Sequence, residues 1–276
     1  MRKKTVILLI LTALLLTLTA GCGAGEEKQL PAFAVEFLST GKSDCAVIFM
    51  DGLVILSDTA DTDDAADIAA LLRDRGAEKI DCIIISHYDK DHIGAAGPLL
   101  RSFPVGRLLR PDYVEDSDEY EDMMAALRET GTEDVVVTEN LVIETENGSI
   151  TVDPPDKDYG DDNNNSMLTT VTYKGRRALF AGDARKKRME EFLRTAPGDI
   201  DFIKLPHHGD GNKALYSLLR GCAPKWAVAT VSEAEVLEPE LTELLDNLNV
   251  TLYRTCEGPV SVAWEGEGFS VRQDPA

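Results

Sequence analysis

Short apolar runs separated by polar turns make up most of the chain after its N-terminal stretch. The first three runs predict strands because each is short and rich in Val, Ile, Leu and Phe, and they lie at 33–38, 46–49 and 53–56. Asp51-Gly52 joins the last two, and this dipeptide favours a tight hairpin turn. Apolar residues at helical spacing over 63–75 predict the first helix.

Further strands are predicted in the middle of the chain, with two helices between them. The strands lie at 82–85, 105–109, 135–137, 141–143 and 150–152, and the helices at 93–102 and 116–130. A polar loop rich in Pro and Asn then spans 154–165, and its length suggests a functional role. A hairpin over 167–180 follows and runs into Ala181-Gly182-Asp183.

Helices and strands alternate in the last third of the chain. The predicted helices are 184–194, 212–220 and 238–248, and the predicted strands are 201–205, 226–230 and 250–254, followed by a hairpin over 260–272. Such alternation is typical of a layered α/β architecture. No internal segment has the composition of a linker, so we predict one domain built from two similar units that each begin with strands.

The first residues form a targeting segment rather than part of the domain. Met1-Arg2-Lys3-Lys4 is basic, and the apolar run 5–20 is too short for a settled membrane span. The run ends in Leu18-Thr19-Ala20-Gly21-Cys22, which resembles the lipobox of bacterial lipoproteins. The resemblance implies that Cys22 is lipidated and becomes the first mature residue, with a cleaved signal peptide or an uncleaved anchor as the alternatives. All three place the domain outside the cytoplasm, and the lipoprotein form is anchored to the cell membrane. We therefore divide the chain into a signal peptide (1–22), a tether (23–31) and a folded domain (32–274).

The chain is strongly acidic, with a formal net charge of −21. Removal of Arg2, Lys3 and Lys4 with the signal peptide takes this charge to −24. An acidic body repels polyanions, which argues against avid non-specific binding of nucleic acid. Hydrolysis of a phosphodiester held at a metal ion is not excluded, because the metal is then the dominant local charge.

Four cysteines follow Cys22, and their spacing shows neither a disulfide framework nor a CxxC pattern. They are Cys45, Cys82, Cys222 and Cys256. Their pairing is left open, although Cys82 lies in a strand-like run and is predicted to be a small buried hydrophobe.

Residues 86–94 (Ser-His-Tyr-Asp-Lys-Asp-His-Ile-Gly) concentrate metal-binding side chains. They follow the buried strand predicted at 82–85 and place four such side chains on one short loop: His87, Asp89, Asp91 and His92. Neutral imidazole and carboxylate suit zinc, manganese or iron. The other two of the four histidines are adjacent, His207-His208, after a later apolar run. Because every histidine lies at a strand end beside carboxylates or glycine, a metal site is favoured over scattered structural histidines.

The order of these elements resembles the metallo-β-lactamase fold, a four-layer αββα sandwich with a metal site at one edge of its two sheets. The likeness covers nearly all of the chain from Phe33 to Arg272. Within the family, the chain most resembles the extracellular hydrolase domain of the DNA-uptake protein ComEC. The stretches that carry this resemblance are Gly41-Lys42-Ser43-Asp44, His87-x-Asp89-x-Asp91-His92, Asn163-Asn164-Asn165-Ser166, His207-His208-Gly209, and the closing helix and strand between Pro239 and Thr255.

The resemblance implies a centre with two divalent metal ions, zinc or manganese. One ion would be held by His87 and Asp89, and the other by Asp91, His92 and either His207 or His208. Asp183 would bridge the two ions, and Asp91 and Asp183 would be the catalytic residues. Two such ions generate a hydroxide nucleophile at neutral pH and clamp the attacking and leaving oxygens of a phosphoryl group. The alternative role for Asp183 is to cap the helix predicted at 184–194.

The resemblance also implies supporting residues around the metals. Asp58 matches an early aspartate that orients a metal ligand in this family, with a turn or cap residue as the alternative. Asn163 and Ser166 would contact a phosphate or help to complete the metal shell, or would belong to an ordinary Asx-rich turn. The basic run 185–188 would draw an anionic substrate toward the metals, or would be a solvated helix face.

The chain departs from the family pattern in three places. The histidine that many relatives carry before the hairpin is absent, Asp210 replaces a serine after His-His-Gly, and no histidine precedes Pro239. These departures leave the identity of the metal open between zinc and manganese. They also motivate a non-catalytic alternative.

The resemblance implies an exported metal-dependent hydrolase, with a phosphodiesterase as the first hypothesis. Its substrate would be a small-molecule or polymeric phosphodiester, such as nucleic acid, nucleotides or a cell-wall phosphodiester. The second hypothesis is hydrolysis of a lactone, β-lactam or other carboxyl ester, since the same nucleophile attacks a carbonyl. The third is a non-catalytic lipoprotein that binds a metal or a ligand. Nucleic acid enters only as a substrate, the membrane is contacted only through the N-terminal lipid, and no protein partner is inferred.

Overall fold

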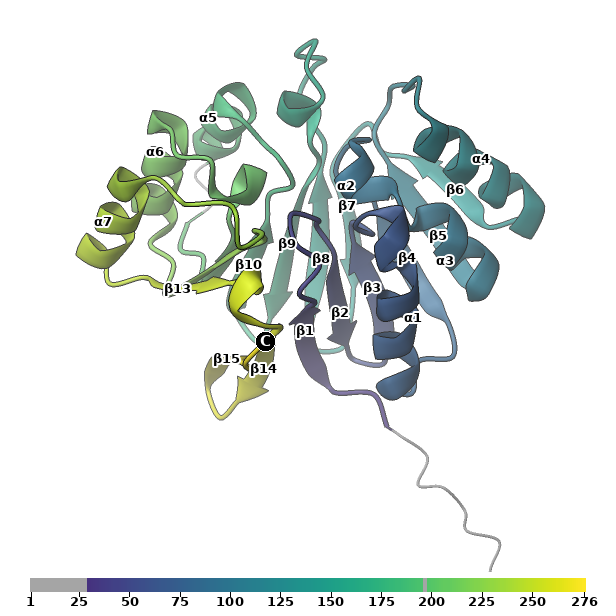
Figure 1. Ribbon diagram of the computed structural model, residues 1–276, viewed down its shortest axis with the longest axis horizontal. Helices are drawn as coiled ribbons and strands as arrows, with labels where there is room; N and C mark the ends of the chain where they lie inside the picture. Colours follow the sequence, from purple (N-terminus) through teal and green to yellow (C-terminus); the bar gives the residue numbers. More distant parts are fainter. Residues whose placement is uncertain (1–28, 196–197) are drawn as a thin grey trace, which may run out of the picture.

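Two β-sheets face each other at the centre of the protein (Figure 1). The computed structural model describes residues 29–195 and 198–276. Within these residues the first sheet has eight strands, in the spatial order β15 (Gly268–Gln273), β14 (Val260–Glu265), β1 (Phe33–Phe37), β2 (Ala46–Met50), β3 (Leu53–Ser57), β4 (Ile80–Ile84), β5 (Val105–Arg110) and β6 (Glu133–Val136). The second has seven, in the order β13 (Thr251–Arg254), β12 (Trp226–Ala229), β11 (Phe202–Lys204), β10 (Arg176–Phe180), β9 (Leu168–Tyr173), β8 (Gly148–Asp153) and β7 (Leu141–Glu144).

Apolar side chains from both sheets fill the space between them. Ile48 and Ile55 of the first sheet are completely buried there, as are Val171 and Phe202 of the second. The ring of Phe37 lies with its centroid 5.8 Å from that of Phe202, which joins the two sheets directly. Burial of each such side chain stabilises the fold by about 1.5–3 kcal/mol, so this inner layer holds the sheets in register.

Helices cover the two outer faces of the sheets (Figure 1). The helices on the first sheet are α1 (Ala65–Asp74), α3 (Ala96–Ser102) and α4 (Asp118–Thr130), and those on the second are α5 (Lys186–Arg194), α6 (Lys213–Cys222) and α7 (Pro239–Asn247). Each buries residues three or four apart, such as Ile68 and Leu72 in α1 and Leu215 and Leu219 in α6. The predicted four-layer αββα sandwich is confirmed.

Local chemistry explains where individual helices begin and end. The hydroxyl of Ser117 accepts a hydrogen bond of 3.3 Å from the backbone N–H of Tyr120 at the start of α4. The helix ends at Gly131, whose φ of 69° suits a residue without a Cβ atom. Asn212 caps α6 in the same way as Ser117 caps α4.

The predicted elements differ from the structure mainly around the candidate metal ligands. Residues 86–94 were expected to form one short loop, but their second half forms α2 (Lys90–Ile93), separate from α3. The helix expected from residue 184 begins at Lys186 instead. Four short 3-10 turns were not predicted as separate elements, since a single turn has no periodicity: η1 (Thr62–Asp64), which overlaps the start of the helix predicted over 63–75, η2 (Asn163–Asn165), η3 (Pro206–Gly209) and η4 (Thr255–Glu257).

Parallel strands place the candidate ligands at strand ends of both sheets. Strands β3 to β6 run parallel in the first sheet, and β10 to β13 run parallel in the second. The carboxyl ends of parallel strands lie at one edge of a sheet, which is where open α/β sheets bind ligands. Residues 86–94 follow β4, Asp183 follows β10, and His207-His208 follow β11.

The predicted signal peptide, with the lipidation site Cys22 and most of the tether, lies outside the described residues. Strand β1 begins at Phe33 and β15 ends at Gln273, within the predicted limits of the domain. Across residues 29–195 and 198–276, no helix has the length and apolar character needed to cross a membrane. In this same part of the chain, all the cysteines are free thiols, and Cys82 is buried in β4.

Gly94 should be sensitive to the addition of a single methyl group. A Cβ atom at this position would lie 2.4 Å from the backbone nitrogen of Thr62 and 2.8 Å from the backbone of Asp61. We expect Gly94→Ala to lower the free energy of unfolding by about 1–3 kcal/mol, because rigid backbone would have to move. The measurement is urea unfolding monitored by circular dichroism.

Gly268→Ala is the matched control for Gly94→Ala. Its Cβ atom would meet nothing closer than the side chain of Arg176 at 4.0 Å. We expect its free energy of unfolding to stay within about 0.5 kcal/mol of the wild-type value. Equal stability of the two variants would contradict the close approach of α2 and η1.

Candidate metal centre

The first half of the centre follows β4. His87 is completely buried directly after this strand, and Asp89 lies at the rim with 43% of its side chain exposed. The α2 turn carries Asp91 and His92. The Nε2 atom of His87 lies 3.3 Å from Oδ2 of Asp89.

The second half follows β10 and β11. Asp183 is buried at the end of β10, and the backbone N–H of His207 donates to the carbonyl of Gly182 at 3.1 Å. His207 and His208 both have left-handed backbone conformations, with φ of 48° and 55°. This conformation is costly for residues with a Cβ atom, by roughly 1–3 kcal/mol each, and such strain is concentrated at functional sites.

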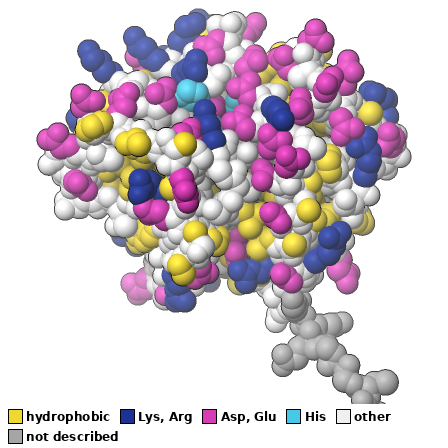
Figure 2. Space-filling model, viewed as in Figure 1, with side chains coloured by type: hydrophobic (Ala, Val, Ile, Leu, Met, Phe, Trp, Pro, Cys, Tyr) yellow, Lys and Arg dark blue, Asp and Glu magenta, His cyan; other side chains and the backbone are white. Residues whose placement is uncertain are grey.

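The two halves meet around Asp183. Its Oδ1 atom lies 3.3 Å from Nε2 of His92, and its Oδ2 atom lies 3.4 Å from Nε2 of His208. The same His208 nitrogen is 3.4 Å from Oδ2 of Asp91. Figure 2 shows histidine atoms at the surface in the upper part of this face, with both basic and acidic side chains around them. Residues up to about 120 positions apart in sequence therefore form one cluster.

The donor atoms of this cluster fit a metal centre. Four buried side-chain atoms have no hydrogen-bond partner among the described residues: His87 Nε2, His92 Nε2, Asp183 Oδ1 and His208 Nε2. Buried polar atoms are normally paired, and an unpaired one costs about 1–3 kcal/mol. The four atoms converge, and all belong to residue types that bind metals. A cation between them would remove the cost of leaving them unpaired.

The grouping of the ligands differs in detail from the predicted one. Donor atoms of His87, His92 and Asp183 lie within 4.8 Å of one another, and so do those of Asp91, His92 and His208. His92 therefore belongs to both groups, whereas the prediction placed it with the second metal only. Asp89 faces His87 from the rim and lies outside these groups.

Asp58 orients both the first ligand loop and His92. Its carboxylate accepts hydrogen bonds from the backbone N–H of Ser86 at 2.7 Å and from the Ser86 hydroxyl at 2.8 Å. It also accepts from Nδ1 of His92 at 2.9 Å. A donating Nδ1 leaves Nε2 of His92 with its lone pair facing Asp183, which is the arrangement that carboxylates impose on metal-binding histidines.

The geometry favours His208 over His207 as a metal ligand. Nδ1 of His208 donates to the carbonyl of Thr230 at 3.0 Å, so its Nε2 lone pair faces the cluster. Both ring nitrogens of His207 are already engaged, one by Arg185 at 3.1 Å and the other by Asp210 at 3.1 Å. Nε2 of His207 is also farther from Asp183, at 3.8 Å.

The carboxylates of the cluster strongly favour positive charge beside them. Burial lowers the pKa of His208, but Asp44, Asp183 and Asp91 outweigh burial and raise this pKa to about 10. Burial likewise acts against charge on His92, yet Asp183 and other carboxylates raise its pKa well above the ordinary value. Burial raises the pKa of Asp183, but the facing imidazoles bring it well below its usual range. A proton or a metal cation satisfies the same electrostatic demand.

Residues 163–166, the Asn-Ser stretch, support the loop that carries Asp183 and the helix that follows it. The side-chain oxygen of Asn164 accepts hydrogen bonds from the backbone N–H groups of Lys187 and Arg188 at 3.0 and 3.3 Å, and so caps α5. Ser166 is completely buried, and its hydroxyl accepts from the backbone N–H of Asp183 at 3.3 Å. The buried side chain of Ser166 therefore supports the loop that carries Asp183. Asn163 lies half-buried at the start of η2.

Two alternatives from the sequence are not supported. Asp183 does not cap the following helix, because α5 begins at Lys186 with Arg185 as its N-cap residue. The basic run 185–188 is not a solvated face throughout, because Arg188 is buried and paired with Asp153 and Glu191.

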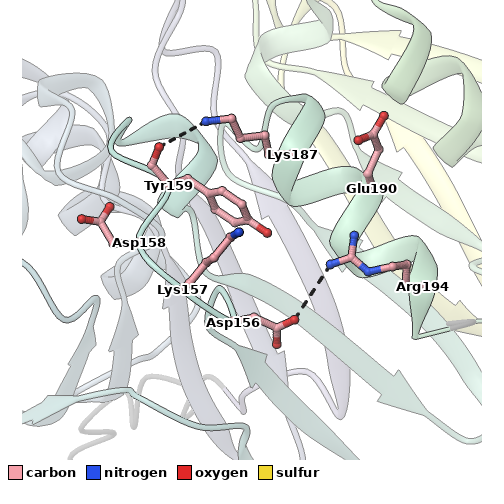
Figure 3. A pocket seen from close by; sticks show the side chains of 7 residues that line it. All are labelled: Asp156, Lys157, Asp158, Tyr159, Lys187, Glu190 and Arg194. Carbon is pink, nitrogen blue, oxygen red and sulfur yellow. Dashed lines mark hydrogen bonds and ion pairs between the residues drawn. The ribbon is translucent and has the colours of Figure 1, made fainter.

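The long loop over 154–165 packs on α5 and borders a cavity of about 530 Å³ (Figure 3). Lys187 donates to the carbonyl of Tyr159 at 3.3 Å, and the two residues lie on facing elements. Arg194 pairs with Asp156 at 4.0 Å across the same cavity. Acidic and basic side chains alternate around it, so this cavity has no marked preference for an anion.

Two buried residues beside the centre were assigned no role from the sequence. Asp44 lies in a stretch that carries the family resemblance, and Lys204 lies in the apolar run 202–205. They form a buried ion pair next to Asp183. A lysine inside an otherwise apolar strand is the sequence signal for such a pair, because buried lysines need a partner.

His208→Ala and His207→Ala should differ in metal binding. We expect His208→Ala to lose at least one equivalent of bound divalent metal, because it removes an unpaired donor atom from the cluster. His207→Ala, which removes a ring that is already hydrogen-bonded, should keep the wild-type metal content. The measurement is elemental analysis of purified protein, supported by calorimetric titration with Zn²⁺ and Mn²⁺. The reverse order of metal loss would contradict the assignment.

Comparison with known proteins agrees with this geometry. The sequence model of the metallo-beta-lactamase superfamily matches residues 39–220. Two curated relatives are ComEC-like: ComE operon protein 3 of Bacillus subtilis is 27% identical over 58% of this chain, and Recombination protein 2 of Haemophilus influenzae is 28% identical over 73%. The aligned segments make up 21% and 25% of those proteins, so this chain spans about a quarter of their length or less.

Solved structures show the same fold. The E377D mutant of CmlA β-hydroxylase superposes with a TM-score of 0.59 at 17% identity, covering 86% of this chain and 55% of that one. The metallo-beta-lactamase fold protein YhfI from Bacillus subtilis superposes with a TM-score of 0.53 at 12% identity, covering 80% and 95%. The predicted resemblance is thus confirmed. The chain belongs to the metallo-β-lactamase superfamily, whose members are generally metallo-hydrolases.

Proposed function

We propose that this protein is an exported, metal-dependent phosphodiesterase that acts on nucleic acid, nucleotides or cell-wall phosphodiesters. The observation that carries the proposal is the set of buried, unpaired donor atoms on His87, His92, Asp183 and His208. The chain belongs to a superfamily of metallo-hydrolases. The unpaired atoms lie at the sheet edge where strand ends meet. Such costly atoms are maintained where function requires them.

The residues of the cluster would hold two divalent cations, with Asp183 shared between them. Donor atoms of His87, His92 and Asp183 gather on one side, and those of Asp91, His92 and His208 on the other. Asp183 would be shared because its two oxygens face His92 and His208 separately, whereas His92, with only Nε2 free, would bind one cation. Bound cations would supply Lewis acidity toward a phosphoryl oxygen and lower the pKa of water. Asp58 would keep the His92 ring oriented during the reaction, as it does in the structure.

Two basic side chains lie near the opening of the centre. A cavity of about 390 Å³ adjoins His207 and His208; Lys42 lies at its wall, paired with Glu235, and Asp210 and Glu238 also line it. The guanidinium of Arg185 contacts His207 at the same opening. Arg185 and the bound cations would attract the negative charge of a phosphodiester, whereas an uncharged lactone carries no such charge. The name of one relative, Recombination protein 2, adds support, since recombination concerns nucleic acid.

Hydrolysis of bis(p-nitrophenyl) phosphate tests the proposed activity. We expect metal-loaded wild-type protein to release p-nitrophenol, and Asp183→Ala to lose more than the roughly 10–100-fold typical for an outer-shell partner. The reason is that Asp183 contacts His92 and His208 in both halves of the centre. Asp246→Ala, at an exposed position of α7, is the control and should keep full activity.

Parallel assays with nitrocefin and an aliphatic lactone separate this proposal from carboxyl-ester hydrolysis. Faster turnover of nitrocefin or the lactone than of the phosphodiester would instead support hydrolysis of β-lactams or carboxyl esters. Metal binding without turnover of any of the three compounds would support the hypothesis of a non-catalytic metal-binding protein.

Membrane attachment is tested at Cys22. We expect Cys22→Ala to release the protein from the membrane fraction and to abolish incorporation of labelled palmitate, because a thiol at this position would carry the lipid. The measurement is fractionation of cells followed by immunodetection. A variant that stays in the membrane without lipid would indicate an uncleaved anchor instead.

A further inference from the structure

A buried ion pair joins the two sheets beneath the metal centre. Lys204 is the last residue of β11 and is 3% exposed, and Asp44 precedes β2 and is 4% exposed. The ammonium group of Lys204 donates to Oδ2 of Asp44. It also donates to the carbonyl of Gly182 at 3.4 Å and lies 3.9 Å from Oδ1 of Asp183. Lys204 therefore touches both Asp44 and the loop that carries Asp183.

Asp44 contacts the first half of the centre through its backbone. Its N–H donates to the carbonyl of Asp91 at 2.9 Å, and its own carbonyl accepts from Ala60 at 2.8 Å. Its side chain points the other way, toward the second sheet, where it meets Lys204 and the hydroxyl of Thr230. One residue thus fixes the α2 side of the centre relative to β11 and β12.

The same network sets the orientation of His208. Nδ1 of His208 lies 3.0 Å from both the carbonyl and the hydroxyl oxygen of Thr230, and 3.5 Å from Oδ1 of Asp44. Thr230 donates its hydroxyl hydrogen to Asp44, so its position depends on that carboxylate. Any shift of Asp44 would be passed to the His208 ring and to its unpaired Nε2 atom.

Lys204 also keeps Asp44 out of the ligand set. Oxygen atoms of Asp44 lie within 4.8 Å of donor atoms of Asp183 and His208, a distance from which a cation could be shared. The ammonium group of Lys204 is already paired with the Asp44 carboxylate. With one ammonium and five carboxylates (Asp44, Asp58, Asp89, Asp91 and Asp183), the centre has a formal charge of −4, which two divalent cations neutralise.

We infer that Asp44 and Lys204 are positioning residues for the metal centre: their ion pair holds the two half-sites in register and orients His208 through Thr230. This inference rests on the proposed function, because it concerns the cations that the centre would bind. Lys204 touches the metal ligand Asp183 but would not itself contact a metal, since its ammonium has no lone pair.

Metal affinity and thermal stability together test this role. The variants are Lys204→Met, Asp44→Asn and the double variant, titrated with Mn²⁺ and Zn²⁺ by calorimetry and melted by differential scanning calorimetry. We expect the weaker metal site to lose about 10–100-fold in affinity in all three variants, as for other outer-shell partners. The melting temperature should fall in each single variant, where one buried charge is left alone, and recover in part in the double variant.

The separation of the two readouts distinguishes positioning from a structural role. A merely structural pair would regain both melting temperature and metal affinity in the double variant, and that result would overturn the inference. Wild-type affinity in the single variants would also overturn it. Lys79→Met is the matched control, because Lys79 forms an exposed pair with Asp81 and should leave both readouts unchanged.

A Co²⁺-substituted sample adds a signature of ligand geometry. We expect the visible absorption bands of bound Co²⁺ to shift in Lys204→Met, because His208 would lose its fixed orientation, and to remain unchanged in Lys79→Met. An unshifted spectrum in Lys204→Met would count against the inference. If the wild-type protein binds none of these metals, both the proposed function and this inference are rejected. If it binds metal but the variants behave like the wild type, only this inference is rejected.

Discussion

The crowding of carboxylates at the junction of the two sheets is the constraint on which the site depends. An ionised carboxylate removed from water needs a partner charge or several hydrogen bonds. Asp58 has Ser86 and His92, and Asp44 has Lys204 and Thr230. Asp183 instead faces ring nitrogens whose lone pairs point at the same space. Only a positive charge placed between them satisfies all of these atoms together.

The fold meets this constraint by dividing the ligands between two sheets. The loop after β4 supplies one half and the loops after β10 and β11 supply the other. Close contact of these halves requires a residue without a side chain: a Cβ atom on Gly182, whose φ is 51°, would lie 2.7 Å from the side chain of Ser86. The left-handed backbone at His207-His208 accompanies the placement of the His208 ring, whose Nε2 atom lies 3.4 Å from Asp91. Local strain is thus tolerated where it completes the cluster.

The sequence predicted the layers well because they depend on periodicity. Apolar runs and helical spacing located the strands and the longer helices, and the resemblance to a known fold supplied their arrangement. The pairing of Asp44 with Lys204 could not be found in this way, since the two residues are 160 positions apart and neither lies in a ligand motif. Arg188 looked solvated because its neighbours are basic, and its partner Asp153 lies 35 positions earlier. Such contacts depend on how the sheets pack, and periodicity carries no information about that.

The acidic surface is compatible with the proposed anionic substrate because long-range repulsion and binding at the metal centre act over different distances. The net charge of −21 repels a polyanion at long range, but salt screens this repulsion beyond a Debye length of about 8 Å. At contact, the proposed substrate would meet the bound cations and Arg185, beside a lining in which Lys42 is accompanied by Asp210, Glu235 and Glu238. A short or flexible phosphodiester can place one phosphoryl group there while the rest of it stays away from the acidic side chains that cover much of the face in Figure 2. A long rigid duplex must bring many phosphates close to those side chains at once, so, for the proposed phosphodiesterase, the electrostatics favour small or single-stranded substrates.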